Sequence, residues 1–168
     1  GWIWVDINED GKISNFTFRG TEASSNNELR YKFAETVIPV GSWVHMAFVF
    51  EYNASGGLRC EFYVNGVKQT LTGWNRSLTE GAGDSKNDPG YQRNIYKITD
   101  GQVLSIGGVA HDRNGLDGVI DNFQVWDKAM TAEDVKTSMG DLDAKNLPSG
   151  IKCYWDFDTE AGSDYTFK

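Results

Sequence analysis

The sequence predicts an all-β protein, an antiparallel two-sheet β-sandwich with one short helix near residues 131–139. Short stretches alternate between apolar and polar residues, as strands with one buried face do. Turn-forming residues separate these stretches, and 19 glycines occur among the 168 residues. A hydrophobic content of 39% with 13% aromatic residues excludes a disordered chain.

The first half of the chain contains six expected strands. Asn65-Gly66 is a strong hairpin signal, and Trp43–Tyr52 is apolar enough to be a central strand covered on both faces. The expected strands are Trp2–Ile7, Lys12–Phe18, Glu28–Phe33, Trp43–Tyr52, Leu58–Asn65 and Val67–Leu71.

A long connection, Thr72–Gln102, follows these strands and is rich in Gly, Asn and Asp. Long loops of sandwich domains often carry binding residues, and aromatic rings stack on sugar rings beside polar hydrogen-bonding groups. An alternative of equal weight is an insertion that packs its own aromatic side chains. The predicted ligand-binding residues are Trp74, Arg76, Tyr91, Arg93 and Tyr96.

A strand from Val103 to Ile106, a polar loop and a strand from Gly118 to Trp126 come next. Alternation places Asp121 on the inward face with Phe123, and a buried carboxylate needs a partner. A structural calcium ion is one such partner, because calcium binds oxygen ligands from short acidic loops. Backbone N–H donors are the alternative. The predicted calcium ligands are Asp112, Asn114, Asp117 and Asp121.

The helix is predicted from its capping residues. Thr131 is the expected N-cap, Asp134 stands at the third helical position, and Met130 with Val135 forms a hydrophobic staple. Gly140 is expected to end the helix. The last strand, Ile151–Asp158, carries Cys153, and both Cys153 and Cys60 are expected to be buried, unpaired thiols rather than a disulfide.

The net charge of -8 argues against nucleic acid and anionic membranes as partners, because both require basic surfaces. No apolar stretch approaches the ~18 residues that a membrane-spanning helix needs, so no membrane insertion is expected. By its length the chain is expected to be a single domain, residues 1–168. It begins without Met and ends abruptly, which suggests a fragment of a longer protein.

Five segments in order carry a family resemblance. They are Ser42–Ala47 (SWVHMA), Phe62–Gly66 (FYVNG), Ser105–Gly108 (SIGG), Gly118–Phe123 (GVIDNF) and Trp126–Val135 (WDKAMTAEDV). The chain resembles the laminin G-like family of the concanavalin A-like lectin/glucanase superfamily, to which the pentraxins are related. The resemblance implies a concanavalin A-like jelly roll, and it implies binding more often than catalysis.

The resulting functional hypothesis is a noncatalytic recognition module of a secreted or cell-surface protein. A polysaccharide or other glycan is the first expected partner and a protein the second. A glucanase-type glycoside hydrolase and a structural spacer are the alternatives. Retaining glucanases of the superfamily carry Glu-x-Asp-x-Glu, whereas the nearest match here is Asp156-x-Asp158-x-Glu160. No catalytic residue is therefore expected, and His45 has no nucleophile motif beside it.

Overall fold

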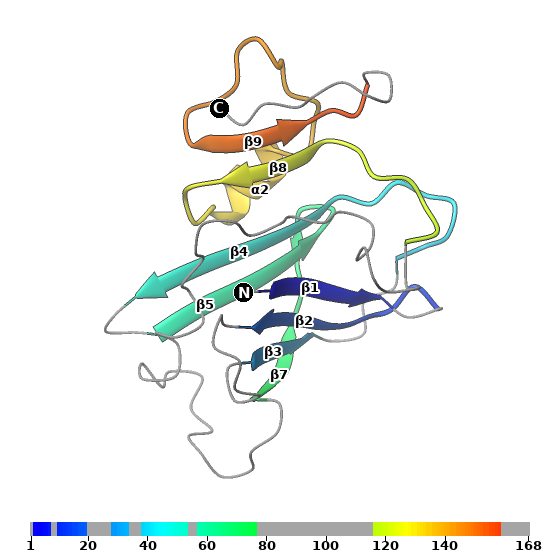
Figure 1. The fold of residues 1–168 in the computed structure, drawn as a ribbon, viewed down its shortest axis with the longest axis vertical. Coiled ribbons are helices and arrows are strands. Elements are labelled where there is room, and N and C mark those ends of the chain that lie inside the picture. The colour runs from blue at the N-terminus through cyan, green and yellow to red at the C-terminus, as the bar shows by residue number, and fades with distance from the viewer. Residues whose placement is uncertain are drawn as a thin grey trace. The chain divides into compact units, whose positions relative to one another are not determined.

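The computed structural model describes residues 2–7, 10–19, 28–33, 38–53, 57–76 and 116–158. The chain forms two compact units, residues 1–102 and residues 103–168, and each unit is described by itself. All described strand pairs are antiparallel, and the described residues contain one short helix (Figure 1). The predicted all-β class, consistent with a concanavalin A-like sandwich, is thereby confirmed.

The first unit contains a four-stranded sheet with the order β1-β2-β3-β7. Its strands are β1 (Trp2–Ile7), β2 (Ile13–Arg19), β3 (Glu28–Phe33) and β7 (Leu71–Arg76). The predicted β1–β2 hairpin is confirmed, with Val5 opposite Phe16. Gly11 in its turn has φ +74°, and the Ile38 N–H donates to the Gly11 carbonyl at 2.9 Å. This bond ties the turn to the segment that precedes the next sheet.

The second sheet of this unit has the order β4-β5-β6. It consists of β4 (Met46–Asn53), β5 (Gly57–Val64) and β6 (Val67–Lys68). Asn65 and Gly66 have φ values of 48° and 72°, which fits the expected two-residue hairpin turn. Phe48 and Phe62 lie opposite each other with ring centroids 4.5 Å apart, and Phe62 is fully buried.

The expected strand Trp43–Tyr52 is shorter at its start than predicted. β4 begins at Met46, the Trp43 side chain is 68% exposed, and among the described strands β4 pairs with β5 alone. The predicted start at Trp43 is therefore wrong, whereas the central position of the strand stays a prediction. Gly41 has φ +75°, so the chain is still turning two residues before Trp43 and cannot yet be extended.

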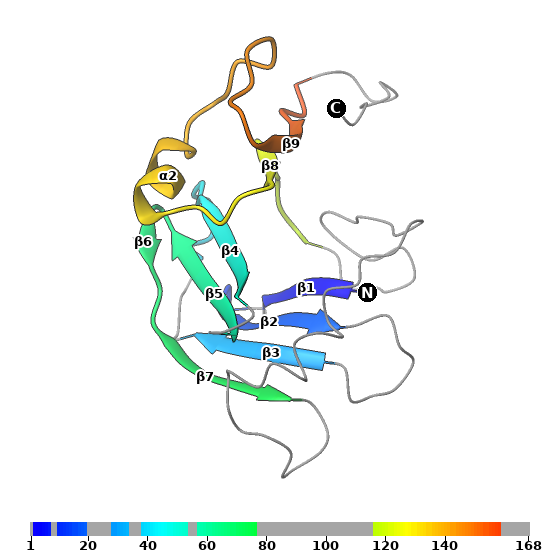
Figure 2. The same ribbon diagram turned by 90° about the vertical axis from the view of Figure 1, so that its left-hand side faces the viewer.

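The connection between β6 and β7 joins the two sheets of the first unit. β6 ends at Lys68 and β7 begins at Leu71, so the chain leaves one sheet and joins the edge of the other within a few residues (Figure 2). The predicted long loop from Thr72 therefore begins as a strand. Its residues pair with β3 in a register that places Trp74 opposite Tyr31.

The second unit contains β8 (Phe123–Trp126), α2 (Ala132–Thr137) and β9 (Ile151–Trp155). β8 and β9 are antiparallel, with Phe123 opposite Trp155. Both strands are shorter than the predicted Gly118–Trp126 and Ile151–Asp158. Non-glycine residues with positive φ, Asn122 at 51° and Phe157 at 54°, flank this end of the pair and interrupt the extended conformation.

The helix is capped as predicted. Thr131 and Asp134 form a reciprocal capping box, and Val135 and Met130 are buried. The helix ends at Thr137 with Ser138 as C-cap, rather than at Gly140. The Ser138 N–H donates to the Asp134 carbonyl and its Oγ donates to Val135, which satisfies the last carbonyls without a glycine. Cys153 in β9 is a free thiol whose pKa is raised by burial, as expected for an unpaired cysteine.

Candidate functional site

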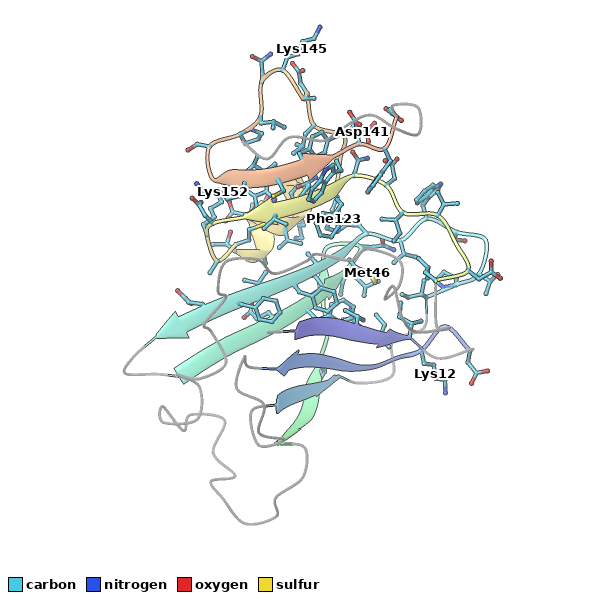
Figure 3. The ribbon with its side chains drawn as sticks, viewed as in Figure 1. Lys12, Met46, Phe123, Asp141, Lys145 and Lys152 are labelled. Carbon is cyan, nitrogen blue, oxygen red and sulfur yellow. The ribbon has the colours of Figure 1, made fainter. Side chains whose placement is uncertain are left out.

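Polar side chains gather where β8 begins and β9 ends. Asn122 directly precedes β8, Tyr154 lies in β9 opposite Gln124, and Asp141 follows the helix. Asp121 and Asp156 flank these residues along the chain. Asp141 and Phe123 are labelled at this end of the strand pair in Figure 3. These five residues, Asp121, Asn122, Asp141, Tyr154 and Asp156, are here called the polar cluster.

Hydrogen bonds join three segments of the second unit through this cluster. The Tyr154 hydroxyl donates to Asn122 Oδ1 at 2.6 Å, and Asn122 Nδ2 donates to Asp141 Oδ1 at 2.6 Å. The Leu142 N–H donates to the Tyr154 hydroxyl oxygen at 3.3 Å. Strand β9, the residue before β8 and the segment after the helix are therefore held in one arrangement.

The helix helps to place Asp141. Gln124 Nε2 in β8 donates to the carbonyl of Ser138 at 3.2 Å, and Trp126 Nε1 donates to Gln124 Oε1 at 3.0 Å. Ser138, the C-cap of α2, is thus attached to β8. Because Asp141 follows only three residues later in the chain, this bond helps to fix its position. Two turns of helix are marginal alone, so these bonds and the buried Val135 hold the helix in place.

Backbone strain marks both edges of the cluster. The Asn122 N–H donates to Asp121 Oδ1 at 2.8 Å, a local bond that suits the left-handed backbone of an asparagine. On the other strand, Phe157 adopts positive φ and the Asp158 N–H donates to Asp156 Oδ1 at 3.3 Å. Positive φ is uncommon for a bulky residue, and such residues concentrate at binding sites and active sites.

The polar cluster carries negative charge and is partly exposed to solvent. Burial, and then the charges of Asp156, Asp141 and Asp121, raise the pKa of Tyr154, while the bond from Leu142 acts in the opposite direction. The Tyr154 hydroxyl therefore remains a hydrogen-bond donor at neutral pH. Asp121 and Asp141 are exposed, and the other members are half-buried. Solvent therefore reaches Asp121 and Asp141 directly.

The predicted ligand-binding residues lie elsewhere. Trp74 and Arg76 are in the strand β7, not in a loop, and they pair with Tyr31 and Leu29 of β3. The placement in a loop was therefore wrong, because edge pairing with β3 extends the chain through Arg76. Their role in binding remains a prediction. Tyr91, Arg93 and Tyr96 lie outside the described residues.

The predicted calcium ligands are only partly described. Asp117 and Asp121 are exposed, whereas Asp112 and Asn114 lie outside the described residues. The prediction that Asp121 faces inward is wrong, because β8 begins only at Phe123 and the alternation does not extend back to Asp121. Within the described ranges, no group of three His, Cys, Asp or Glu side chains could hold an ion. The calcium hypothesis therefore depends on Asp112 and Asn114.

No role is predicted from the sequence for three members of the polar cluster, namely Asn122, Asp141 and Tyr154. Asn122 belongs to the segment Gly118–Phe123, but nothing in that segment marks its side chain as functional. Tyr154 has the opposite parity to the inward residues of its strand, which was a usable signal for an outward hydroxyl. Asp141 carries no local signal, because the fold of the helix and its connection brings it to Asn122.

His45 has a structural environment. Its N–H donates to Asn65 Oδ1 and its carbonyl accepts the Asn65 N–H, both at 2.9 Å, so the hairpin turn is fastened to the start of β4. Burial lowers the pKa of His45, and its buried Nδ1 has no hydrogen-bond partner among the described residues. An unpartnered, desolvated imidazole nitrogen fits packing better than acid–base catalysis.

The glucanase-like run lacks the required geometry in its described part. β9 ends at Trp155, and the left-handed Phe157 lies between Asp156 and Asp158. The two carboxylates therefore do not alternate along one strand, as the paired acids of retaining enzymes do. Glu160 lies outside the described residues.

Comparison with known proteins gives one match. A family model of the laminin G type, described as concanavalin A-like lectin/glucanases superfamily, matches residues 1–136. No curated protein and no solved structure matches the chain. Among the described residues, no helix has the length and apolar character needed to traverse a bilayer.

Proposed function

Because the chain belongs to the concanavalin A-like lectin/glucanases superfamily, through its laminin G-like family, we propose that it is a noncatalytic module that binds carbohydrate. The observation that carries this proposal is the polar cluster, in which Tyr154, Asn122 and Asp141 form a continuous hydrogen-bonded series at a solvent-accessible end of β8 and β9. Fixed amide and carboxylate groups suit sugar hydroxyls, which both donate and accept hydrogen bonds.

The proposed setting is a secreted or cell-surface protein, in keeping with the family membership. The earlier candidates Trp74, Arg76, Tyr91, Arg93 and Tyr96 form a second proposed contact region, to which aromatic rings would contribute stacking. A structural calcium ion held by Asp112, Asn114, Asp117 and Asp121 is a further proposal.

A glycan array with single-residue variants tests the carbohydrate proposal. Removal of the central amide in Asn122→Ala should weaken binding about tenfold, the effect of one or two lost hydrogen bonds. Lys145→Ala is a matched control, because Lys145 is exposed in the same unit and its side chain is not part of the cluster. Equal binding by wild type and Asn122→Ala would contradict the role of the cluster.

An array without any bound glycan would favour a protein partner instead. The segment before β4 provides the surface to test in that case, because Val40 is 95% exposed and Trp43 is 68% exposed. Exposed large apolar side chains that lie close together are typical of protein-binding surfaces.

The noncatalytic part of the proposal is tested separately. The chain should release no reducing sugar from β-glucans or from a panel of other polysaccharides. Hydrolysis that is lost on Glu160→Gln would place the chain with the glycoside hydrolases of the superfamily.

A further inference from the structure

We propose that Tyr154 is a positioning residue that, together with Asp141, holds the orientation of the Asn122 amide, so that the polar cluster selects uncharged, hydroxyl-rich ligands over anionic ones. This inference rests on the proposed carbohydrate binding and deepens it by naming the charge class of the ligand. It also has a part that can be tested without any ligand, namely the orientation of the amide.

The direction of each hydrogen bond follows from the chemistry of the groups. The Leu142 N–H can only donate, so the Tyr154 oxygen accepts it. The single hydroxyl proton is then directed to Asn122, 2.6 Å away, and must meet an acceptor, which is Oδ1. On the other side the Asp141 carboxylate only accepts, so it must face Asn122 Nδ2. Both neighbours therefore impose the same amide orientation.

The hydrogen-bond donors and acceptors that this arrangement leaves free define what a ligand meets. Asn122 Nδ2 keeps one N–H, and Asp141 keeps Oδ2, which accepts no hydrogen bond from the described residues. A sugar hydroxyl can accept from the amide and donate to the adjacent carboxylate at the same time. A sulfate or carboxylate group has no proton to donate at neutral pH, so it satisfies only half of the site.

The negative charge of the polar cluster also favours uncharged ligands over anionic ones. Asp121, Asp141 and Asp156 all lie close enough to Tyr154 to raise the pKa of its hydroxyl. Within the described part of the chain, no Lys or Arg is ion-paired with these three carboxylates. Lys128 and Lys152, which lie towards the other end of the strand pair, are ion-paired with Asp134 and Asp127. An anionic ligand would therefore meet uncompensated like charge, which is a strong basis for rejection.

The experiment compares neutral and acidic polysaccharides by affinity electrophoresis. The wild-type chain should be retarded strongly by neutral polymers such as mannan, xylan or β-glucan, and only weakly by polygalacturonate or heparan sulfate. Tyr154→Phe should lower the affinity for the neutral polymers about tenfold. The ratio of the affinities for neutral and acidic polymers should therefore fall. Asp141→Asn, which removes one charge, should also raise relative binding of the acidic polymers.

Tyr63→Phe is the matched control, since it removes a tyrosine hydroxyl that bonds to Glu61 outside the cluster. Thermal melts of all variants identify any that fail to fold. A purely structural role for Tyr154 would lower binding of every polymer equally, leaving the neutral-to-acidic ratio unchanged, and that result would overturn the inference.

Nuclear magnetic resonance tests the positioning step without a ligand. In the wild type, the Asn122 Nδ2 proton that is bonded to Asp141 should exchange with solvent more slowly than the other Nδ2 proton. In Tyr154→Phe, where Asp141 alone holds the amide, this bonded proton should change in shift and exchange faster. Unchanged amide resonances would overturn the inference even if glycans bind. Absence of binding to all polymers would overturn the proposed function together with the ligand selectivity, while the resonances would still decide the role of Tyr154.

Discussion

At the scale of single residues, the backbone conformation explains several choices of amino acid. Gly11 and Gly41 have nearly equal positive φ values, 74° and 75°. Their surroundings differ: a Cβ on Gly11 would lie 2.5 Å from the Ile38 carbonyl oxygen, whereas a Cβ on Gly41 would meet nothing within 4 Å. Gly41 is therefore needed for its backbone conformation alone, whereas Gly11 is also needed because the Ile38 backbone lies close to it.

This difference gives a stability prediction. Gly41→Ala should cost about 1–2 kcal/mol of unfolding free energy, the usual penalty for a left-handed residue with a side chain. Gly11→Ala should cost ~1–3 kcal/mol more, because the added methyl group also collides with backbone. Urea denaturation of the two variants measures the difference directly. Equal losses would show that the turn can move away from Ile38 at no cost.

His45 leads to a prediction about pH. Burial lowers its folded-state pKa below the ordinary 6.5, so the unfolded chain binds more protons between the two values. The unfolding free energy should therefore fall as pH drops below 6.5 and should level off below the folded pKa. Chemical denaturation across this range should show the fall in wild type and a weaker fall in His45→Gln. The same slope in both proteins would mean that another group titrates.

At the scale of elements, the short helix depends on its first turn. The bonds to the backbone and side chain of Thr131 lower the pKa of Asp134 to about 2, with help from Lys128. Val135 then lies fully buried one residue later. Capping and burial together keep six residues helical in a chain dominated by strands.

Removal of the cap should destabilise the helix measurably. Thr131→Ala should cost about 1 kcal/mol, whereas Thr131→Ser, which keeps the hydroxyl, should cost much less. Because the pKa of Asp134 is depressed from 3.8 to about 2, its contribution should be complete above pH 3.8 and lost as pH falls towards 2. Melting curves at neutral pH and at low pH measure both effects. Equal stability of the Ala and Ser variants would contradict the role of the capping bond.

At the scale of the whole chain, the calcium proposal is the one that global stability can decide. An ion that binds only the folded state stabilises it by mass action. The melting temperature should therefore rise with added calcium and fall with excess chelator, and Asp112→Asn should reduce the response. Lys152→Ala serves as a surface control. An unchanged melting temperature, together with no metal in elemental analysis, would rule out the bound ion.

The fold class, the β1–β2 and β5–β6 hairpins and the capped helix could all be predicted from the amino-acid sequence. These depend on local signals: alternation, Asn65-Gly66 and the Thr131–Asp134 pair act between near neighbours in the chain. The tertiary structure decided where the strands begin and end, because Gly41, Asn122 and Phe157 adopt left-handed backbone that alternation does not reveal. It also decided the polar cluster, since Asn122, Asp141 and Tyr154 meet only after the helix and β9 have folded back to the start of β8.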